Sequence, residues 1–182
     1  MNLDSLFGLL SAAQAQCGHR EYVIVGSLSV LGMAQVTSIP EDMTMSIDAD
    51  CYTEADPSRI FDLQGALGEG SAYHRDHGIY LDPVSPRLPT LPDGWQQRLI
   101  RVRRGETVAL FLDPNDAAVS KLARAEPRDL RWVRAGLTAG IVSLPAVRLR
   151  MRNTVFFDEP EEKAALQALE RLAPAKARRG KA

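Results

Sequence analysis

An apolar segment that runs directly into a Gly-Ser turn constrains the fold of this 182-residue chain more than any other feature. Residues 21–25 read Glu-Tyr-Val-Ile-Val and predict a buried strand, and Gly26 and Ser27 follow it at once. Residues 28–33 predict a short helix that opens directly after the turn. The first backbone N–H groups of a helix lack partners within it, so this arrangement favours a phosphate at the turn.

Two carboxylates lie two residues apart in the next predicted strand, which covers roughly residues 43–52. Positions i and i+2 share a face of a strand, so Asp48 and Asp50 are expected to project from the same side. The opposite face is expected to contact the core through Met45, Ile47, Ala49 and Cys51. Adjacent carboxylates raise each other's pKa unless a cation lies between them, and a divalent metal with oxygen ligands would explain the pair. The alternative is the solvated acidic face of an edge strand.

The other elements of the first 112 residues alternate between helices and strands. The sequence predicts helices over residues 3–17 and 56–67, a strand over 78–82, and a hairpin whose strands cover 98–103 and 106–112. Residues 69–77 read as a polar loop in which His74 and His77 are exposed histidines rather than metal ligands. In the third strand, Tyr80 and Asp82 share a face.

The last third of the chain predicts helices only, over residues 113–125, 127–139, 145–153 and from 158 onwards. Residues 174–182 form a basic tail that we expect to be disordered. This order predicts an α/β (α+β) core over 1–112 and a helical C-terminal region over 113–173.

Composition and charge are those of an ordinary soluble protein. The net charge of −1 gives no overall attraction to nucleic acid or to a membrane surface. Cys17 and Cys51 both lie in apolar patterns and read as reduced core residues. The sequence lacks a basic N-terminal region followed by an apolar run, and it has no stretch of 18 apolar residues. We therefore expect a cytoplasmic protein without a membrane partner.

Together, the Gly-Ser turn, the Asp-x-Asp strand and the Asp of the later strand resemble the nucleotidyltransferase superfamily, whose fold is shared with DNA polymerase beta. The resemblance implies a small mixed sheet with flanking helices. It also implies that Gly26 and Ser27 bind the triphosphate of an NTP, and that Asp48 and Asp50 bind Mg²⁺ or Mn²⁺. Asp82 matches the third carboxylate of the family. These three acids would then be the catalytic residues.

The chain is most similar to a small bacterial branch of this superfamily that is related to the nucleotidyltransferases of toxin–antitoxin systems. The resemblance covers about residues 21–150 and rests on the segments 65–71, 78–80, 91–95, 112–116, 120–123 and 128–129. Lys121 lies in one of these segments, one turn inside a predicted helix, and could pair with a phosphate as a point charge.

Two functions follow from the resemblance. The first is transfer of a nucleoside monophosphate from an NTP to an acceptor, either an RNA end or a protein side chain. The second is a catalytically inactive binding protein of the same fold, for example one half of a toxin–antitoxin pair. Geometry separates them, because catalysis requires Asp48, Asp50 and Asp82 to converge beside the Gly26-Ser27 turn.

Overall fold

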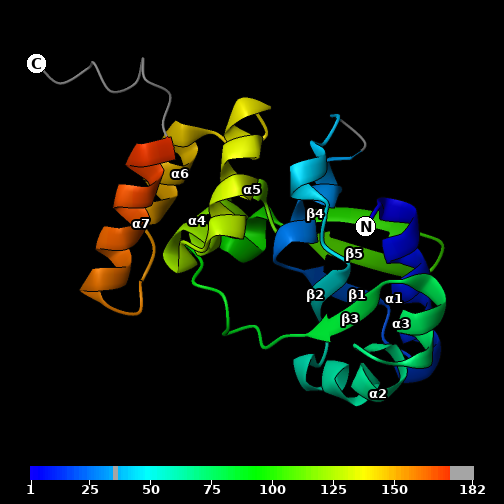
Figure 1. The fold of residues 1–182 in the computed structure, drawn as a ribbon. Helices are drawn as coiled ribbons and strands as arrows, with labels where there is room; N and C mark the ends of the chain where they lie inside the picture. Colours follow the sequence, from blue (N-terminus) through cyan, green and yellow to red (C-terminus); the bar gives the residue numbers. More distant parts are fainter. Residues whose placement is uncertain (35–36, 173–182) are drawn as a thin grey trace, which may run out of the picture. The chain divides into compact units, whose positions relative to one another are not determined.

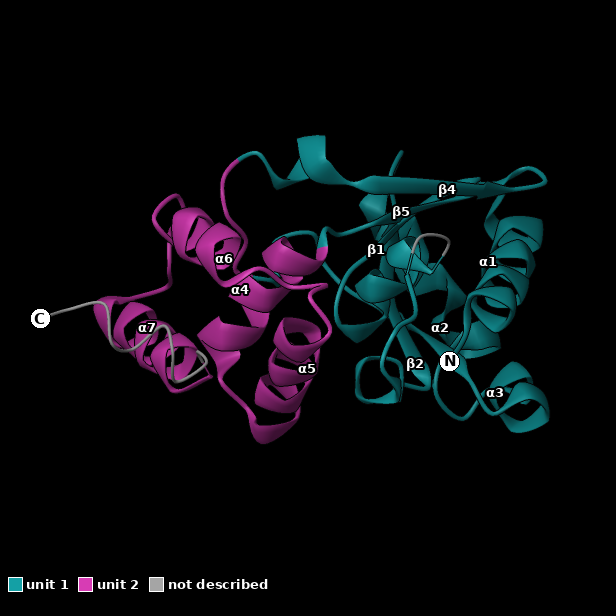
Figure 2. Cartoon of the chain, turned by 90° about the horizontal axis from the view of Figure 1, so that it is seen from above, with its two compact units in different colours: residues 1–89, 94–113 teal, residues 90–93, 114–182 magenta. Residues whose placement is uncertain are grey.

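The computed structural model describes residues 1–34 and 37–172, which form two compact units (Figure 2). Unit 1 contains residues 1–89 and 94–113, and unit 2 contains residues 90–93 together with the chain from residue 114 onwards. The tail predicted over residues 174–182 lies outside the described residues.

Unit 1 is built on a five-stranded mixed sheet with the strand order β3-β2-β1-β5-β4 (Figure 1). Its strands are β1 (Glu21–Ile24), β2 (Asp48–Thr53), β3 (Tyr80–Pro83), β4 (Ile100–Arg104) and β5 (Thr107–Phe111). The central strand β1 is antiparallel to β2 and parallel to β5. At the two edges, β3 runs parallel to β2, and β4 runs antiparallel to β5. The prediction of a small mixed sheet with flanking helices is confirmed.

Helix α1 (Leu3–Cys17) has the bounds that its apolar spacing predicts. Asn2 and Ser5 form a capping box at its start, and Gly18 ends it in the left-handed conformation with φ = 74°. Its apolar face contacts β5 and the 3₁₀ helix η3 (Pro57–Leu63), so the helix covers the sheet and closes the core of unit 1.

Short helices make up the remaining connections of unit 1. They are η1 (Ser27–Met33), η2 (Glu41–Met43), α2 (Gln64–Leu67), α3 (Ala72–His77) and η4 (Trp95–Arg98). The short helix expected after the Gly-Ser turn is present as η1. Residues 69–77 are not entirely the loop that we predicted, because the hydroxyl of Ser71 accepts a hydrogen bond from the His74 amide and caps α3.

The acidic strand begins later than its sequence suggests. We expected a strand over residues 43–52 with Met45 and Ile47 in the core, but β2 starts at Asp48, and these two side chains are 68% and 48% exposed. They lie between η2 and the strand, where the two-residue alternation of a strand does not apply. From Asp48 to Cys51 the alternation holds, because Ala49 and Cys51 are fully buried and the two acids are half-buried.

Unit 2 is helical. It consists of α4 (Pro114–Arg124), α5 (Pro127–Thr138), α6 (Leu144–Met151) and α7 (Glu159–Leu172). Helix α4 contacts the other three, and Trp132 of α5 is the largest fully buried side chain. None of the helices within the described parts of the chain has the length and apolar character needed to cross a membrane.

Candidate metal site of three carboxylates

Three carboxylates from two neighbouring strands converge on one face of the unit 1 sheet. In the parallel register of β2 and β3, Asp50 pairs with Asp82, and Asp48 pairs with Tyr80. Each acid offers a carboxylate oxygen, and the three oxygens all lie within 4.8 Å of one another. All three acids are half-buried, so the cluster remains open to solvent. The structure thus brings together the three acids on which the enzymatic hypothesis depends.

The register that aligns these acids is held by backbone hydrogen bonds at both ends of β3. The amide of Tyr80 donates to the carbonyl of Ile47 at 3.1 Å, and the amide of Val84 donates to the carbonyl of Cys51 at 3.1 Å. Pro83, which follows Asp82, has no amide hydrogen to donate. Because β3 is an edge strand, one side of its backbone needs no partner, so a proline is tolerated there. Asp82 therefore lies within the strand, opposite Asp50.

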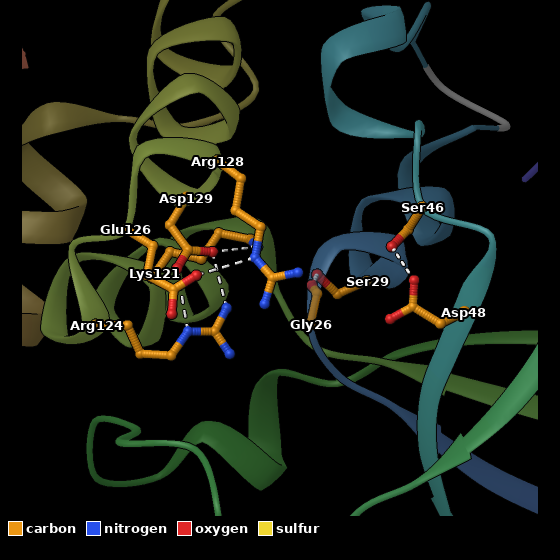
Figure 3. Close-up of polar contacts among 9 residues, drawn as sticks. All are labelled: Gly26, Ser29, Ser46, Asp48, Lys121, Arg124, Glu126, Arg128 and Asp129. Carbon is orange, nitrogen blue, oxygen red and sulfur yellow. Dashed lines mark hydrogen bonds and ion pairs between the residues drawn. The ribbon is translucent and has the colours of Figure 1, made fainter. Parts of the chain in front are cut away.

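Gly26 lies against the acidic cluster. Its backbone has φ = 65° and ψ = −149°, a combination that is essentially restricted to glycine. A Cβ atom at this position would lie 1.9 Å from Oδ2 of Asp50. The amide of Val25 donates to the carbonyl of Asp50 at 3.0 Å, and the Ser29 hydroxyl donates to the carbonyl of Gly26 at 2.8 Å (Figure 3). The turn therefore lies directly beside Asp50, and Ser27 opens η1.

The acids of the cluster influence the ionisation of one another and of Tyr80. Burial raises the pKa of Asp82, the negative charge of Asp48 raises it further, and a hydrogen bond with Asp50 offsets part of the effect. Burial also raises the pKa of Tyr80, and the nearby carboxylates, Asp48 first, raise it further. A divalent cation would relieve this repulsion, and carboxylate oxygens are the ligands that Mg²⁺ and Mn²⁺ prefer. The donor set therefore fits such an ion.

The cluster has further polar neighbours, of which Ser46 was expected from the sequence on the same face as Asp48 and Asp50. The hydroxyl of Ser46 donates to Oδ1 of Asp48 at 2.6 Å (Figure 3). The α-amino group of Met1 donates to the carbonyls of Thr44 and Ser46, at 2.7 and 2.9 Å. Burial lowers the pKa of this amino group, and the charge of Asp48 partly offsets the effect. This contact joins residues more than 40 positions apart, and no local pattern signals it.

Lys121 belongs to unit 2, where its side chain is only 3% exposed. Its Nζ lies 3.1 Å from Oδ1 of Asp129 (Figure 3) and 5.1 Å from the centroid of the Trp132 ring. Arg124 also donates to both carboxylate oxygens of Asp129. These contacts give the ammonium group a structural role within unit 2. Its binding to a phosphate stays a prediction.

One comparison with known proteins identifies a family. A model of the family described as "Nucleotidyltransferase of unknown function (DUF6036)" matches residues 2–173. No curated protein matches the chain. No solved structure matches it either. The family match spans nearly the whole sequence and includes the Gly-Ser turn and all three carboxylates, and the chain therefore belongs to this nucleotidyltransferase family.

Proposed function

We propose that the protein is a metal-dependent nucleotidyltransferase that moves a nucleoside monophosphate from an NTP to an acceptor hydroxyl. The observation that carries the proposal is the convergence of Asp48, Asp50 and Asp82 on one face of the sheet, with Gly26 in contact with Asp50. A cluster of three acids alone is common on protein surfaces. Its position beside a glycine-only turn, in a member of this family, favours catalysis over a solvated acidic face.

The three carboxylates would hold Mg²⁺ or Mn²⁺. The bound metal supplies electrostatic stabilisation of the charge that spreads over the transferred phosphoryl group. Ser46 would keep Asp48 oriented through its 2.6 Å hydrogen bond. Because Gly26 has no side chain, the carboxylate of Asp50 can lie directly against the turn where we place the triphosphate, and Ser27 adds a hydroxyl group to this turn.

Asp82 would face the acceptor. It comes from β3, on the opposite side of β2 from the strand that leads into Gly26. As a ligand of the metal, Asp82 would help to hold the ion that activates the acceptor hydroxyl.

Calorimetric titration with ATP, GTP, CTP and UTP in the presence of Mg²⁺ tests the proposal. We expect the wild-type protein to bind at least one NTP only when the metal is present, and the Asp48→Asn, Asp50→Asn double variant to lose this binding. The matched control is the Asp42→Asn, Asp76→Asn double variant, which makes the same charge change at two exposed acids. Failure of the wild type to bind, or equal binding by the first variant, would contradict the proposal and favour the inactive binding protein.

A further inference from the structure

Tyr80 belongs to the same array of side chains as the three carboxylates. Asp48 and Asp50 of β2 pair with Tyr80 and Asp82 of β3, so all four residues lie on one face of the sheet. On the opposite face, Ala49 and its partner Leu81 are fully buried. Tyr80 is half-buried, and it therefore presents an aromatic ring next to the acids, partly open to solvent.

The ring of Tyr80 is paired with the ring of His74. The two ring centroids lie 4.7 Å apart with an interplanar angle of 53°. Nδ1 of His74 accepts a hydrogen bond from the amide of Gly70 at 3.0 Å, which fixes the orientation of the imidazole. The Ser71 cap holds the same turn of α3 in place. Two aromatic rings are thus held in a defined position at the β3 edge of the acidic cluster.

The strand order places Tyr80 and His74 on the side of β2 that lies away from the Gly26-Ser27 turn. Gly26 follows β1, and Tyr80 begins β3, so the two residues lie on opposite sides of β2. In an in-line displacement the attacking and leaving oxygens lie on opposite sides of the transferred phosphorus. If the triphosphate occupies the Gly26-Ser27 turn, an acceptor bound on the other side of β2 would lie next to Tyr80.

We propose that Tyr80, supported by His74, is a positioning residue that stacks on the terminal nucleoside of an RNA acceptor. The inference rests on the proposed function and names its acceptor class. Aromatic rings bind unpaired bases by stacking, whatever the base. The surrounding carboxylates, Glu69 among them, repel phosphates and acidic peptides alike. The 3′-terminal nucleoside of an RNA fits this environment because it presents a base and hydroxyls, and no phosphate follows it.

Fluorescence anisotropy with a 5′-labelled RNA pentanucleotide tests the inference, in the presence of Mg²⁺ and a non-reactive ATP analogue. We expect the wild type to bind the intact RNA about 10-fold more tightly than an RNA with an abasic 3′-terminal residue. Tyr80→Leu should reduce binding of the intact RNA to the abasic level and leave binding of the abasic RNA unchanged. Tyr80→Phe, which retains the ring, should keep the preference.

The matched control is His77→Leu, because His77 belongs to a second tyrosine–histidine pair in α3, with its ring centroid 4.2 Å from that of Tyr73. This variant should keep the wild-type preference, and thermal unfolding of every variant checks the fold. The inference is wrong if Tyr80→Leu keeps the preference or if the wild type shows none. It is also wrong if mass spectrometry after incubation with ATP finds the nucleotide attached to Tyr80. If the wild type bound no NTP in the calorimetric titration, that result would instead refute the proposed function itself.

Discussion

Gly26 and Asp50 are so close that no side chain can be added to Gly26 without moving the carboxylate. An ideal Cβ at Gly26 would lie 1.9 Å from Oδ2 and 2.8 Å from Cγ of Asp50. The close approach ties the conformation of the turn to the position of an acid in the candidate metal site.

Substitution of Gly26 by alanine should both destabilise the protein and impair the site. The positive φ of 65° disfavours any other residue, at a cost of about 1–3 kcal/mol, and the new methyl group must displace Asp50. Chemical denaturation should show the loss of stability, and calorimetry should show loss of metal-dependent NTP binding. Gly18→Ala is the control, because Gly18 has a similar φ of 74° but no atom within 4 Å of the place that a new methyl group would occupy. It should lose stability and keep NTP binding.

Asp82→Asn should stabilise the metal-free protein. Asp50 and Asp82 are paired directly across β2 and β3, where like charges are unfavourable by an amount on the order of 0.2–1 kcal/mol. The same substitution removes a metal ligand, so the variant should gain less thermal stability from Mn²⁺ than the wild type does. Differential scanning calorimetry with EDTA and with Mn²⁺ measures both effects. A lower melting temperature of the metal-free variant would contradict the account of the cluster as electrostatically repulsive.

The difference in stability between the wild type and the Asp82→Asn variant should depend on pH. The pKa of Asp82 in the folded protein is raised above its ordinary value of 3.8. Between that value and the raised pKa, the folded state binds more protons than the unfolded state, so the free energy of unfolding falls as the pH rises. Without metal, the advantage of Asp82→Asn should be full at neutral pH and disappear as the pH approaches 3.8. Urea denaturation at several pH values checks this trend, and a constant difference would contradict it.

In unit 2, substitution of Asp129 should lower the free energy of unfolding substantially. Burial opposes its ionisation, yet the hydrogen bond from Arg124 and the charge of Lys121 hold its pKa below 3.8. Asp129→Ala would leave the buried ammonium group of Lys121 without this partner, which costs about 3–5 kcal/mol in comparable buried pairs. Glu126→Ala is the control, since the pair of Glu126 with Arg128 is 52% and 70% exposed and is worth about 0–1 kcal/mol. Denaturation midpoints of the two variants should therefore differ clearly.

Local sequence patterns predicted the elements that local chemistry determines. The apolar spacing and the glycine stop placed α1 at its observed bounds, and the two-residue alternation placed Asp48 and Asp50 on a common face. The same alternation failed for Met45 and Ile47, because the signal does not tell where a strand begins. The sequence predicts a loop in place of α3 and its Ser71 cap, because this helix is short and polar.

Relationships between distant segments could not be predicted from periodicity. The parallel pairing that sets Asp82 opposite Asp50 joins strands about 30 residues apart, and only the resemblance to a family suggested it. The tilted contact between the rings of His74 and Tyr80 depends on how α3 returns to the edge of the sheet. Tyr80 was expected on the face of Asp82, but its contact with His74 became visible only in the structure.

Direct measurement of Mn²⁺ binding tests the central claim, that Asp48, Asp50 and Asp82 form a metal site. The ion is titrated into the wild type and into the Asp48→Asn, Asp50→Asn double variant, and electron paramagnetic resonance reports the free ion. The account predicts that the wild type removes Mn²⁺ from solution and that the double variant, while still unfolding cooperatively, does not. Equal concentrations of free Mn²⁺ in the solutions of the wild type and the double variant would contradict it.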